Sequence, residues 1–300
     1  MRLTLNGSLG SGKSSVGKLL SSRHSVPYIS TGMIFREIGK ISNLNALQTN
    51  LAAENNSEID FQVDKKIVEL DTSLPEFIID SRMAWHFVHN AINVFLSVTI
   101  DTAAERVMHD LTRTGEHYST LGDAKRALVE RRASESKRYQ RLYGVDIDSN
   151  SNYDLVLITD NTSVESVATS IEKYMVDRRH KYWIPKSRIV PMESIRSASG
   201  LRFATRFSTE EMNPIPLIVA ENFGFYFGAA SALINALHAD GDLIPYQIQR
   251  PEHLADDQDP FSLAMSTLRP SDLYDWEDCA HHRFAIVEHL AARKTTNNTN

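Results

Sequence analysis

Eight residues near the N-terminus, Gly7 to Ser14, have the spacing of a phosphate-binding loop, G-x-x-x-x-G-K-[S/T]. Glycines let the backbone turn tightly so that its N–H groups can point at phosphate oxygens, and the following helix N-terminus adds partial positive charge. In such a loop Lys13 reaches the β- and γ-phosphates of ATP, and the hydroxyl of Ser14 binds Mg²⁺. The residues expected around the nucleotide are Gly7, Ser8, Gly10, Ser11, Gly12, Lys13, Ser14 and Ser15.

The residues that flank this loop favour a nucleotide site over a chance match. An apolar run at residues 3–5 precedes the loop, and Val16, Leu19 and Leu20 follow it at helical spacing. A strand, then the loop, then a helix is the context in which the motif binds phosphate. The usual interpretation of one lysine is a solvated surface residue, but inside this loop the phosphate role is favoured for Lys13.

Two further segments carry charges that phosphoryl transfer can use. Asp80-Ser81-Arg82 ends an apolar run with an acid and a base, and residues 125–141 contain seven Lys or Arg against two Glu. Arginine binds phosphate oxygens in a bidentate way, and catalysis of this reaction is mostly positioning and electrostatic stabilisation. The alternative for the basic stretch is a solvated helix face whose charges are paired.

The elements that must position these residues alternate between short apolar runs and longer helical patterns. The expected strands are residues 3–5, 77–79, 94–98 and 155–158, with a very short one at 28–29. Strands separated by helices predict an α/β fold, in which a parallel sheet has helices on both faces.

The length of 300 residues favours two domains, since one domain usually holds roughly 100–200 residues. A helical pattern from about residue 164 to 179 ends in a basic run, and Trp183-Ile184-Pro185 then interrupts it. We therefore expect a first domain at residues 1–180, a second at 181–292 and a disordered polar tail at 293–300.

Composition and charge exclude several classes of protein. Hydrophobic residues make up 42% of the chain and charged residues 23%, which excludes a disordered chain, a coiled coil and a collagen-like fibre. The single cysteine, Cys279, excludes an internal disulfide framework and a thiolate-rich metal site, and fits a reducing compartment. The net charge of −6 argues against coating nucleic acid by bulk charge. We expect no membrane span, no signal peptide and a cytoplasmic protein.

Five segments, dispersed along the chain in order, resemble the cytidylate kinases, especially the shorter archaeal-type branch. They read GSLGSGKSS, YISTGMIFRE, FIIDSRMAW, ERRASESKRYQRLYGVDI and NYDLVLITDN. The resemblance runs from Met1 to about Lys173. It implies a P-loop fold like that of nucleoside-monophosphate kinases, with an ATP site, an acceptor nucleotide site and a closing lid.

The same resemblance assigns roles to individual residues. Lys13 would bind ATP phosphates, Arg82 would hold the acceptor phosphate, and Arg131 and Arg138 would act as lid arginines on the transferring group. The residues implied at the acceptor nucleotide are Ser30, Gly32 and Arg36. One departure affects the acceptor pocket: the family usually has Glu-Gly-Arg where this chain has Asp80-Ser81-Arg82.

Asp80 permits two kinds of phosphoryl transfer. An acceptor phosphate is already anionic and needs no general base, so Asp80 would then position Mg²⁺ or its waters. An acceptor hydroxyl benefits from a base, and a carboxylate at the carboxyl end of a strand is well placed for that role. A purely structural alternative is a buried aspartate that caps the following helix.

The second domain resembles the ParB/sulfiredoxin-like fold over about 65 residues, roughly 183–250. That family binds phosphate through a charged motif at the start of a helix, whereas this chain has Gly228-Ala229-Ala230-Ser231 there. We therefore expect an α+β domain without catalytic chemistry, which serves as a scaffold or as a docking surface for a protein or for DNA. The acidic residues between 252 and 278 would repel a phosphate backbone.

Three functions remain open, and a pyrimidine kinase is favoured over a non-catalytic nucleotide-binding regulator. The acceptor would be the hydroxyl of a modified pyrimidine in DNA, of the 5-hydroxymethyl type used in phage DNA hypermodification, or free CMP or dCMP. We prefer the DNA acceptor slightly, because a free-nucleotide kinase needs no appended segment of about 120 residues. The preference rests on analogy between folds, and the acidic charge weighs against it.

Overall fold

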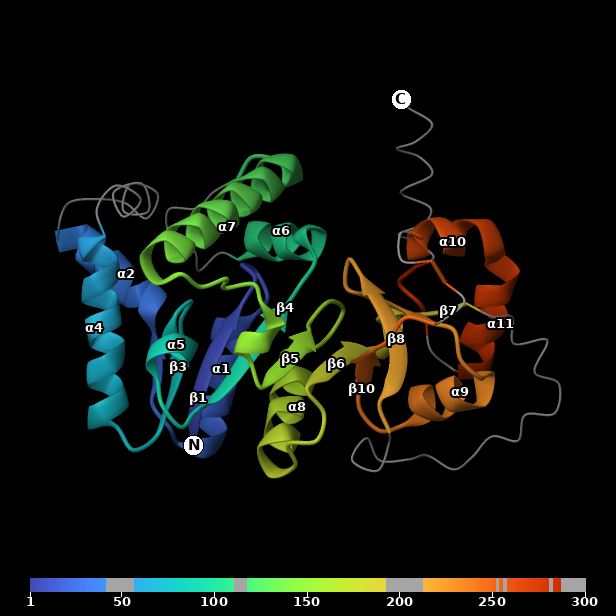
Figure 1. Cartoon of the computed structure of the whole chain (residues 1–300), viewed down its shortest axis with the longest axis horizontal. Coiled ribbons are helices and arrows are strands. Elements are labelled where there is room, and N and C mark those ends of the chain that lie inside the picture. Colours follow the sequence, from blue (N-terminus) through green and yellow to red (C-terminus); the bar gives the residue numbers. More distant parts are fainter. Residues whose placement is uncertain are drawn as a thin grey trace. The chain divides into compact units, whose positions relative to one another are not determined.

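A computed structural model describes residues 1–41, 57–110, 118–192, 213–251, 254–255, 258–280 and 283–286. The chain divides into two compact units, Met1–Thr159 and Asp160–Asn300 (Figure 1). This division lies before the boundary expected at residues 180 and 181, since helix α8 (Val164–Val176) is grouped with the second unit. The boundary near residue 181 stays a prediction about functional domains, and the expected tail at 293–300 lies outside the described residues.

The first unit contains the expected parallel sheet. Its strands are β1 (Arg2–Gly7), β2 (Tyr28–Ser30), β3 (Phe77–Asp80), β4 (Ile92–Ser97) and β5 (Leu155–Ile158). They pair in the order β2-β3-β1-β4-β5, and each neighbouring pair is parallel. The mixed α/β fold with a largely parallel sheet is therefore confirmed. Because carboxyl ends of parallel strands meet at one edge of a sheet, this order brings Gly7 and Asp80 to the same edge.

Helices cover both faces of this sheet. They are α1 (Lys13–His24), α2 (Thr31–Ile41), α4 (Glu58–Ser73), α5 (Ala84–Phe87), α6 (Ile100–His109) and α7 (Leu121–Tyr143), with the 3-10 turn η1 (Asn150–Asn152) before β5. On one face Gly17 of α1 lies so close to β1 and β2 that an added Cβ would sit 2.4 Å from the Tyr28 ring. On the other face Phe77 and Ile79 pack against Ile67 of α4 and Ala84 of α5.

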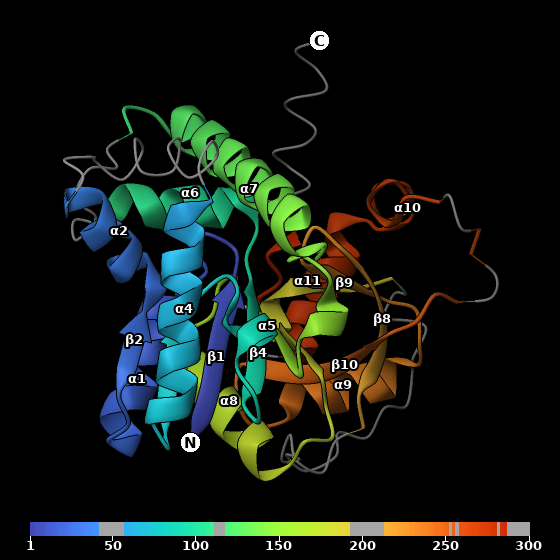
Figure 2. The same ribbon diagram turned by 60° about the vertical axis from the view of Figure 1, so that its left-hand side comes forward.

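Helix α7 is the long basic helix that the sequence predicted. It lies side by side with α6, and Ala103 and Val107 of α6 pack against Ala124 and Leu128 of α7 (Figures 1 and 2). The hydroxyl of Thr120 caps the first turn by accepting from the Asp123 N–H. At the other end a left-handed glycine terminates the helix, as is common for helix C-termini.

The strands of the second unit pair in both parallel and antiparallel directions. Its elements after α8 are β6 (Tyr182–Pro185), η2 (Lys186–Arg188), β7 (Ile189–Pro191), β8 (Ile215–Ala220), β9 (Phe223–Tyr226), α9 (Ala230–His238), β10 (Leu243–Ile248), α10 (Pro260–Thr267) and α11 (Pro270–Ala280). The strands follow the order β6-β10-β8-β9-β7. Pairs β10–β6 and β8–β9 are antiparallel, and pairs β10–β8 and β9–β7 are parallel. Buried rings of Phe223, Phe225 and Phe261 pack edge to face.

The described helices include none that is both long and apolar enough to cross a bilayer.

Replacing Ile67 by alanine should test the packing of α4 on β3. Ile67 is fully buried, so Ile67→Ala removes apolar contacts and should lower the free energy of unfolding by roughly 2–5 kcal/mol. Its neighbour Val68 is 45% exposed, so Val68→Ala is the matched control and should change stability by less than about 1 kcal/mol. Urea unfolding of both variants measures the difference, and equal losses would contradict this packing.

Candidate active site

The predicted phosphate-binding loop connects β1 to α1, and its glycines have backbone conformations that other residues avoid. Gly10 and Gly12 have φ of +76° and +89°. Gly7 has φ of +145°, and a Cβ there would sit 2.1 Å from the Leu96 carbonyl oxygen of β4. The Ser8 N–H donates to that same oxygen at 3.0 Å. Strand β4 therefore supports the start of the loop. Ser11 is buried, whereas Ser14 and Ser15 are exposed on the first turn of α1.

Lys13 is folded back onto its own loop. Its ammonium group donates to the carbonyl oxygens of Gly7 at 3.0 Å and Ser8 at 2.8 Å. Burial lowers the pKa of Lys13 well below its usual value, and the positive charge of Arg82 lowers it further. Carbonyl groups thus hold a cation that is poorly solvated, which anionic phosphate oxygens can stabilise better than neutral carbonyls can.

Asp80 ends β3 and faces the start of α1. Its Oδ2 accepts from the Ser14 hydroxyl at 3.1 Å and from the Tyr28 hydroxyl at 2.9 Å. Burial and the charge of Asp80 raise the pKa of Tyr28, so this phenol stays a donor. A carboxylate beside a serine hydroxyl is a hard oxygen donor set of the kind Mg²⁺ prefers, and Mg²⁺ keeps its remaining positions for water and phosphate. The predicted pair of Ser14 and Asp80 therefore fits this metal.

Arg82 follows directly after the strand end and turns toward the phosphate-binding loop. Its Nη1 donates to the Gly7 carbonyl at 2.6 Å, and its Nε donates to Glu135 of α7 at 2.8 Å. The preceding residue, Ser81, points elsewhere, because its buried side-chain oxygen accepts from the Met83 N–H at 3.1 Å. Ser81 thus stabilises the turn that presents Arg82.

Glu135 collects three arginines around one buried carboxylate. Besides Arg82, Arg131 Nε donates to it at 3.1 Å and Arg132 lies 4.0 Å away. Burial alone would raise the pKa of Glu135, but the three guanidinium groups outweigh that effect and lower its pKa to about 2. The carboxylate therefore stays charged at neutral pH and fixes the three guanidinium groups.

Arg138, the second predicted lid arginine, has different partners from Arg131. It is buried, lies 3.3 Å from Asp60 of α4 and places its guanidinium 5.1 Å from the centre of the Tyr139 ring. Its Nε and Nη1 and the Oδ2 of Asp60 have no hydrogen-bond partner among the described residues. Arg138 therefore ties α7 to α4, and its contact with a transferring phosphate stays a prediction.

The three predicted acceptor residues lie at the end of β2 and the start of α2. Ser30 is half-buried and Gly32 is exposed. Between them, the hydroxyl of Thr31 donates to the Asp80 carbonyl at 3.2 Å, which places this segment beside the carboxyl end of β3. The backbone of Arg36 belongs to α2, but its side chain lies outside the part of the molecule that the structure describes.

Sequence patterns did not indicate Glu135, Tyr28 or the acidic pair Asp60 and Asp64 as residues of the site. Asp64 accepts from the Tyr143 hydroxyl, and burial is the main cause that raises its pKa to about 6. The available signal was a four-residue spacing, which places Asp60 and Asp64 on one face of a helix, and likewise Arg131 and Glu135.

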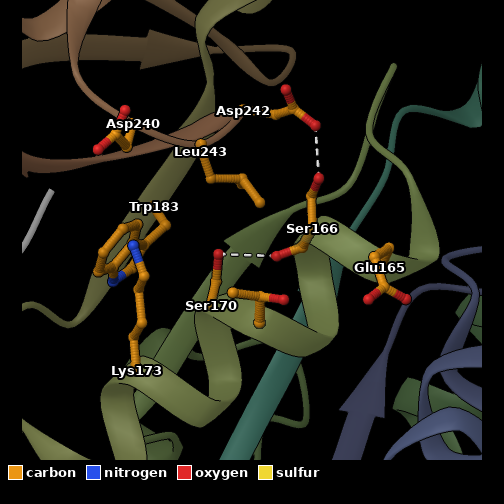
Figure 3. Close-up of a pocket in the computed structure, with 10 residues that line it drawn as sticks. Glu165, Ser166, Ser170, Lys173, Trp183, Asp240, Asp242 and Leu243 are labelled. Atoms are coloured by element: carbon orange, nitrogen blue, oxygen red, sulfur yellow. Dashed lines mark hydrogen bonds between the residues drawn. The ribbon is translucent and has the colours of Figure 1, made fainter. Parts of the chain in front are cut away.

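A separate cavity of ≈ 110 Å³ lies in the second unit (Figure 3). Ser166 and Lys173 of α8, Trp183 of β6 and Asp242 of the turn before β10 line it, and Ser166 donates to Asp242. Ligand pockets usually enclose roughly 300–1,000 Å³, so this cavity is too small for a nucleotide. Among the described residues, no group of three His, Cys, Asp or Glu side chains could hold a metal ion.

The parallel sheet, the phosphate-binding loop and the arginines around Glu135 together define a P-loop phosphotransferase. The sequence profile of the Cytidylate kinase-like family matches residues 2–161, more than half of the chain, and the protein belongs to this family.

Curated relatives agree with this assignment. Cytidylate kinase of Methanosphaera stadtmanae is 31% identical over 179 residues, which cover 60% of this chain and 100% of the relative. Cytidylate kinase of Sulfolobus acidocaldarius is 35% identical over 57% of this chain and 92% of its own. That of Sulfurisphaera tokodaii is 34% identical over 58% of this chain and 95% of its own.

Glu135→Gln should test the arginine cluster. The variant removes the carboxylate that Arg82 and Arg131 bond and that Arg132 shares with Asp148, and should lower the free energy of unfolding at pH 7 by about 2–3 kcal/mol, since these groups are partly exposed. Glu130→Gln, at an exposed position of the same helix, is the control.

The contribution of Glu135 to the free energy of unfolding should depend on pH. Because the folded-state pKa of Glu135 is lowered, its contribution is present above about pH 4.5 and is lost as the pH falls toward 2. Denaturant unfolding should therefore show the wild type and Glu135→Gln converging in acid. A constant difference across this range would contradict the charge argument.

Asp64→Asn should stabilise the protein at neutral pH. The folded-state pKa of Asp64 is about 6 against 3.8 for the free side chain, so wild-type stability falls as the pH rises from about 4 to 6 and stays lower above that range. The variant should therefore gain about 1–3 kcal/mol on the wild type between pH 4 and 7, as read by thermal and urea unfolding. Asp240→Asn, at an exposed site, should show no such gain.

Proposed function

We propose that this protein transfers the γ-phosphoryl group of Mg²⁺-bound ATP to a pyrimidine nucleotide, with free CMP or dCMP as the acceptor. One observation carries the proposal: the charges gathered around the phosphate-binding loop. The cations Lys13, Arg82, Arg131 and Arg132 outnumber the anions there, which are Asp80, Glu135 and the Asp148 that pairs with Arg132. A surplus of positive charge suits two phosphate groups that must approach each other.

The reaction balances without a protein base. An anionic oxygen of the acceptor phosphate attacks the γ-phosphorus, the bond to the β–γ bridging oxygen breaks, and ADP leaves. No proton needs to be removed, so the carboxylate of Asp80 can stay with Ser14 at the metal. Mg²⁺ would neutralise charge that develops on the phosphate oxygens. Membership of the Cytidylate kinase-like family and the names of the relatives support a cytidine nucleotide as acceptor.

Helix α7 supplies the closing element in this proposal. Near its middle it carries Arg131 and Glu135 to the loop side, and one to two turns later Arg138 contacts α4. The helix therefore links the phosphate-binding loop to α4, which contacts α2, and the end of β2 and the start of α2 carry the residues that would receive the acceptor, Ser30, Gly32 and Arg36. We assign Arg131 to the transferring group and Arg138 to holding the lid on α4.

A second candidate is the hydroxyl of a 5-hydroxymethylpyrimidine in DNA. The length of the chain favours it, because 179 of its 300 residues already match the whole length of the first relative and the rest has no match there. In this reaction Asp80 would take the hydroxyl proton, and the second unit, with its proposed ParB-like fold, would dock DNA or a protein. The net charge of −6 makes this acceptor the less favoured of the two.

Labelled ATP offered with CMP, dCMP, dUMP, unmodified DNA and 5-hydroxymethylpyrimidine DNA should distinguish the acceptors. We expect label in CDP or dCDP, whereas label confined to the DNA base would establish the second candidate. Lys13→Ala should lower kcat by at least about 10²-fold, because the lysine stabilises charge at the transferring group. Lys18→Ala, exposed on the same helix, should retain activity.

Asp80→Asn separates the two reactions further. If Asp80 only holds the metal, the variant should be less active, and a higher Mg²⁺ concentration should restore part of the activity. If Asp80 is a general base, the variant should be less active and added Mg²⁺ should not restore the activity.

A further inference from the structure

Asp160 is a fully buried carboxylate whose two oxygens are held by residues far along the chain. It follows β5 and Thr159, and its side chain is 0% exposed. Arg188 donates to Oδ1 at 3.0 Å and the Asn222 amide donates to Oδ2 at 3.0 Å. The next residue, Asn161, has φ of +51°, so the chain turns sharply at this point. The position of the Asp160 side chain is therefore set by Arg188 and Asn222, which follow it by 28 and 62 residues in the sequence.

Its chain neighbour Thr159 is in turn bound to the phosphate-binding loop. The Thr159 hydroxyl lies 3.2 Å from the Ser11 carbonyl oxygen. Arg106 donates to the Thr159 carbonyl at 2.6 Å and to the Gly10 carbonyl at 3.3 Å. Two carbonyl groups of the loop are thus held by Thr159 and Arg106. A displacement of residue 160 must act on residue 159 through the peptide bond between them.

The two residues that hold Asp160 belong to the buried core of the second unit. The guanidinium of Arg188 lies 4.4 Å from the centre of the Phe223 ring, and that ring packs against Phe261. Asn222 occupies the turn between β8 and β9, where it has φ of +60° and Glu221 has φ of +48°. Two successive positive φ values are typical of the tight turn that joins antiparallel strands. Both residues are therefore fixed by their own surroundings.

The residues that hold Asp160 lie beyond the part of the chain that matches the family profile. The family profile ends at residue 161, so it includes Asp160 but neither Arg188 nor Asn222. The first relative is matched over its whole length by 179 residues of this chain. Asp160 thus lies inside the part of the chain that the profile matches, and Arg188 and Asn222 lie beyond it.

We propose that Arg188 and Asn222 are positioning residues for the ATP site, acting through Asp160 and Thr159 on the carbonyls of Gly10 and Ser11. This inference rests on the proposed use of ATP but not on the identity of the acceptor. Loss of the restraint lets the loop carbonyls and the N–H groups between them move relative to the phosphates. The affinity for ATP should fall, whereas the affinity for the acceptor should not.

Asn222→Gly is the sharpest variant, because glycine keeps the positive φ and removes only the amide. It should raise the KM for ATP about tenfold and leave the KM for CMP within about twofold, an effect of the size seen when a supporting contact of a site is removed. Glu221→Gly is the matched control, since it loosens the same turn without removing the Asn222 amide. It should leave both KM values unchanged.

Arg188→Lys provides a second variant that keeps the charge but loses the rigid guanidinium fork. It should give a smaller rise in the KM for ATP than Arg188→Met, in which the buried Asp160 loses the positive charge of Arg188. The double variant Arg188→Met with Asp160→Asn removes both charges, so it should restore stability without restoring ATP affinity.

ATP binding by the full-length chain is also measured directly, from the rise in melting temperature on adding ATP and Mg²⁺. The wild type should be stabilised, and Asn222→Gly should need about ten times more ATP for the same shift. A wild type that ATP does not stabilise would refute the proposed function. A wild type that ATP stabilises, with Asn222→Gly unchanged in ATP affinity or with both KM values altered equally, would overturn the positioning role alone.

Discussion

One buried carboxylate, that of Glu135, organises the charged side of the phosphate-binding loop. Three guanidinium groups would repel one another if they were gathered beside Lys13 without a counter-charge. Glu135 lets them stay close, and their combined field keeps the carboxylate ionised, with a pKa of about 2. Arg82 bonds at once to Glu135 and to the Gly7 carbonyl, so it links α7 to the loop. The cations beside the phosphate-binding loop therefore depend on an anion that belongs to α7.

Local patterns in the sequence predicted the parallel sheet, the phosphate-binding loop and the long basic helix, because each depends on residues close together in the chain. They did not predict which partners α7 would meet. Arg131 and Arg138 are seven residues apart, which places them on one face of a helix but about 10 Å apart along it. That separation is enough for Arg131 to meet Glu135 at the loop side while Arg138 meets Asp60. Glu135 was counted only as a minority charge in a basic run, although its spacing from Arg131 was visible.

Sequence patterns predicted less of the second unit, because many of its contacts join residues that are distant in the sequence. The helix expected to start at Gly228-Ala229-Ala230-Ser231 corresponds to α9, because its apolar spacing is local. The bonds from Asp160 to Arg188 and Asn222 join residues with no periodic relation, so no pattern could indicate them. The division of the chain after Thr159 follows from such distant contacts, whereas the break expected near residue 181 came from composition.

Gly7 has a consequence for how a loop of this kind should be interpreted in diverged proteins. Its Cβ position is filled by the Leu96 carbonyl of the neighbouring strand, so the sheet itself forbids a side chain there. A descendant that no longer bound nucleotide would still be selected to keep this glycine for packing. Survival of the glycine therefore says little about whether such a descendant is an active enzyme. Once catalysis is lost, the charged residues Lys13 and Arg82 can be replaced. Their presence is therefore the better marker of a working kinase.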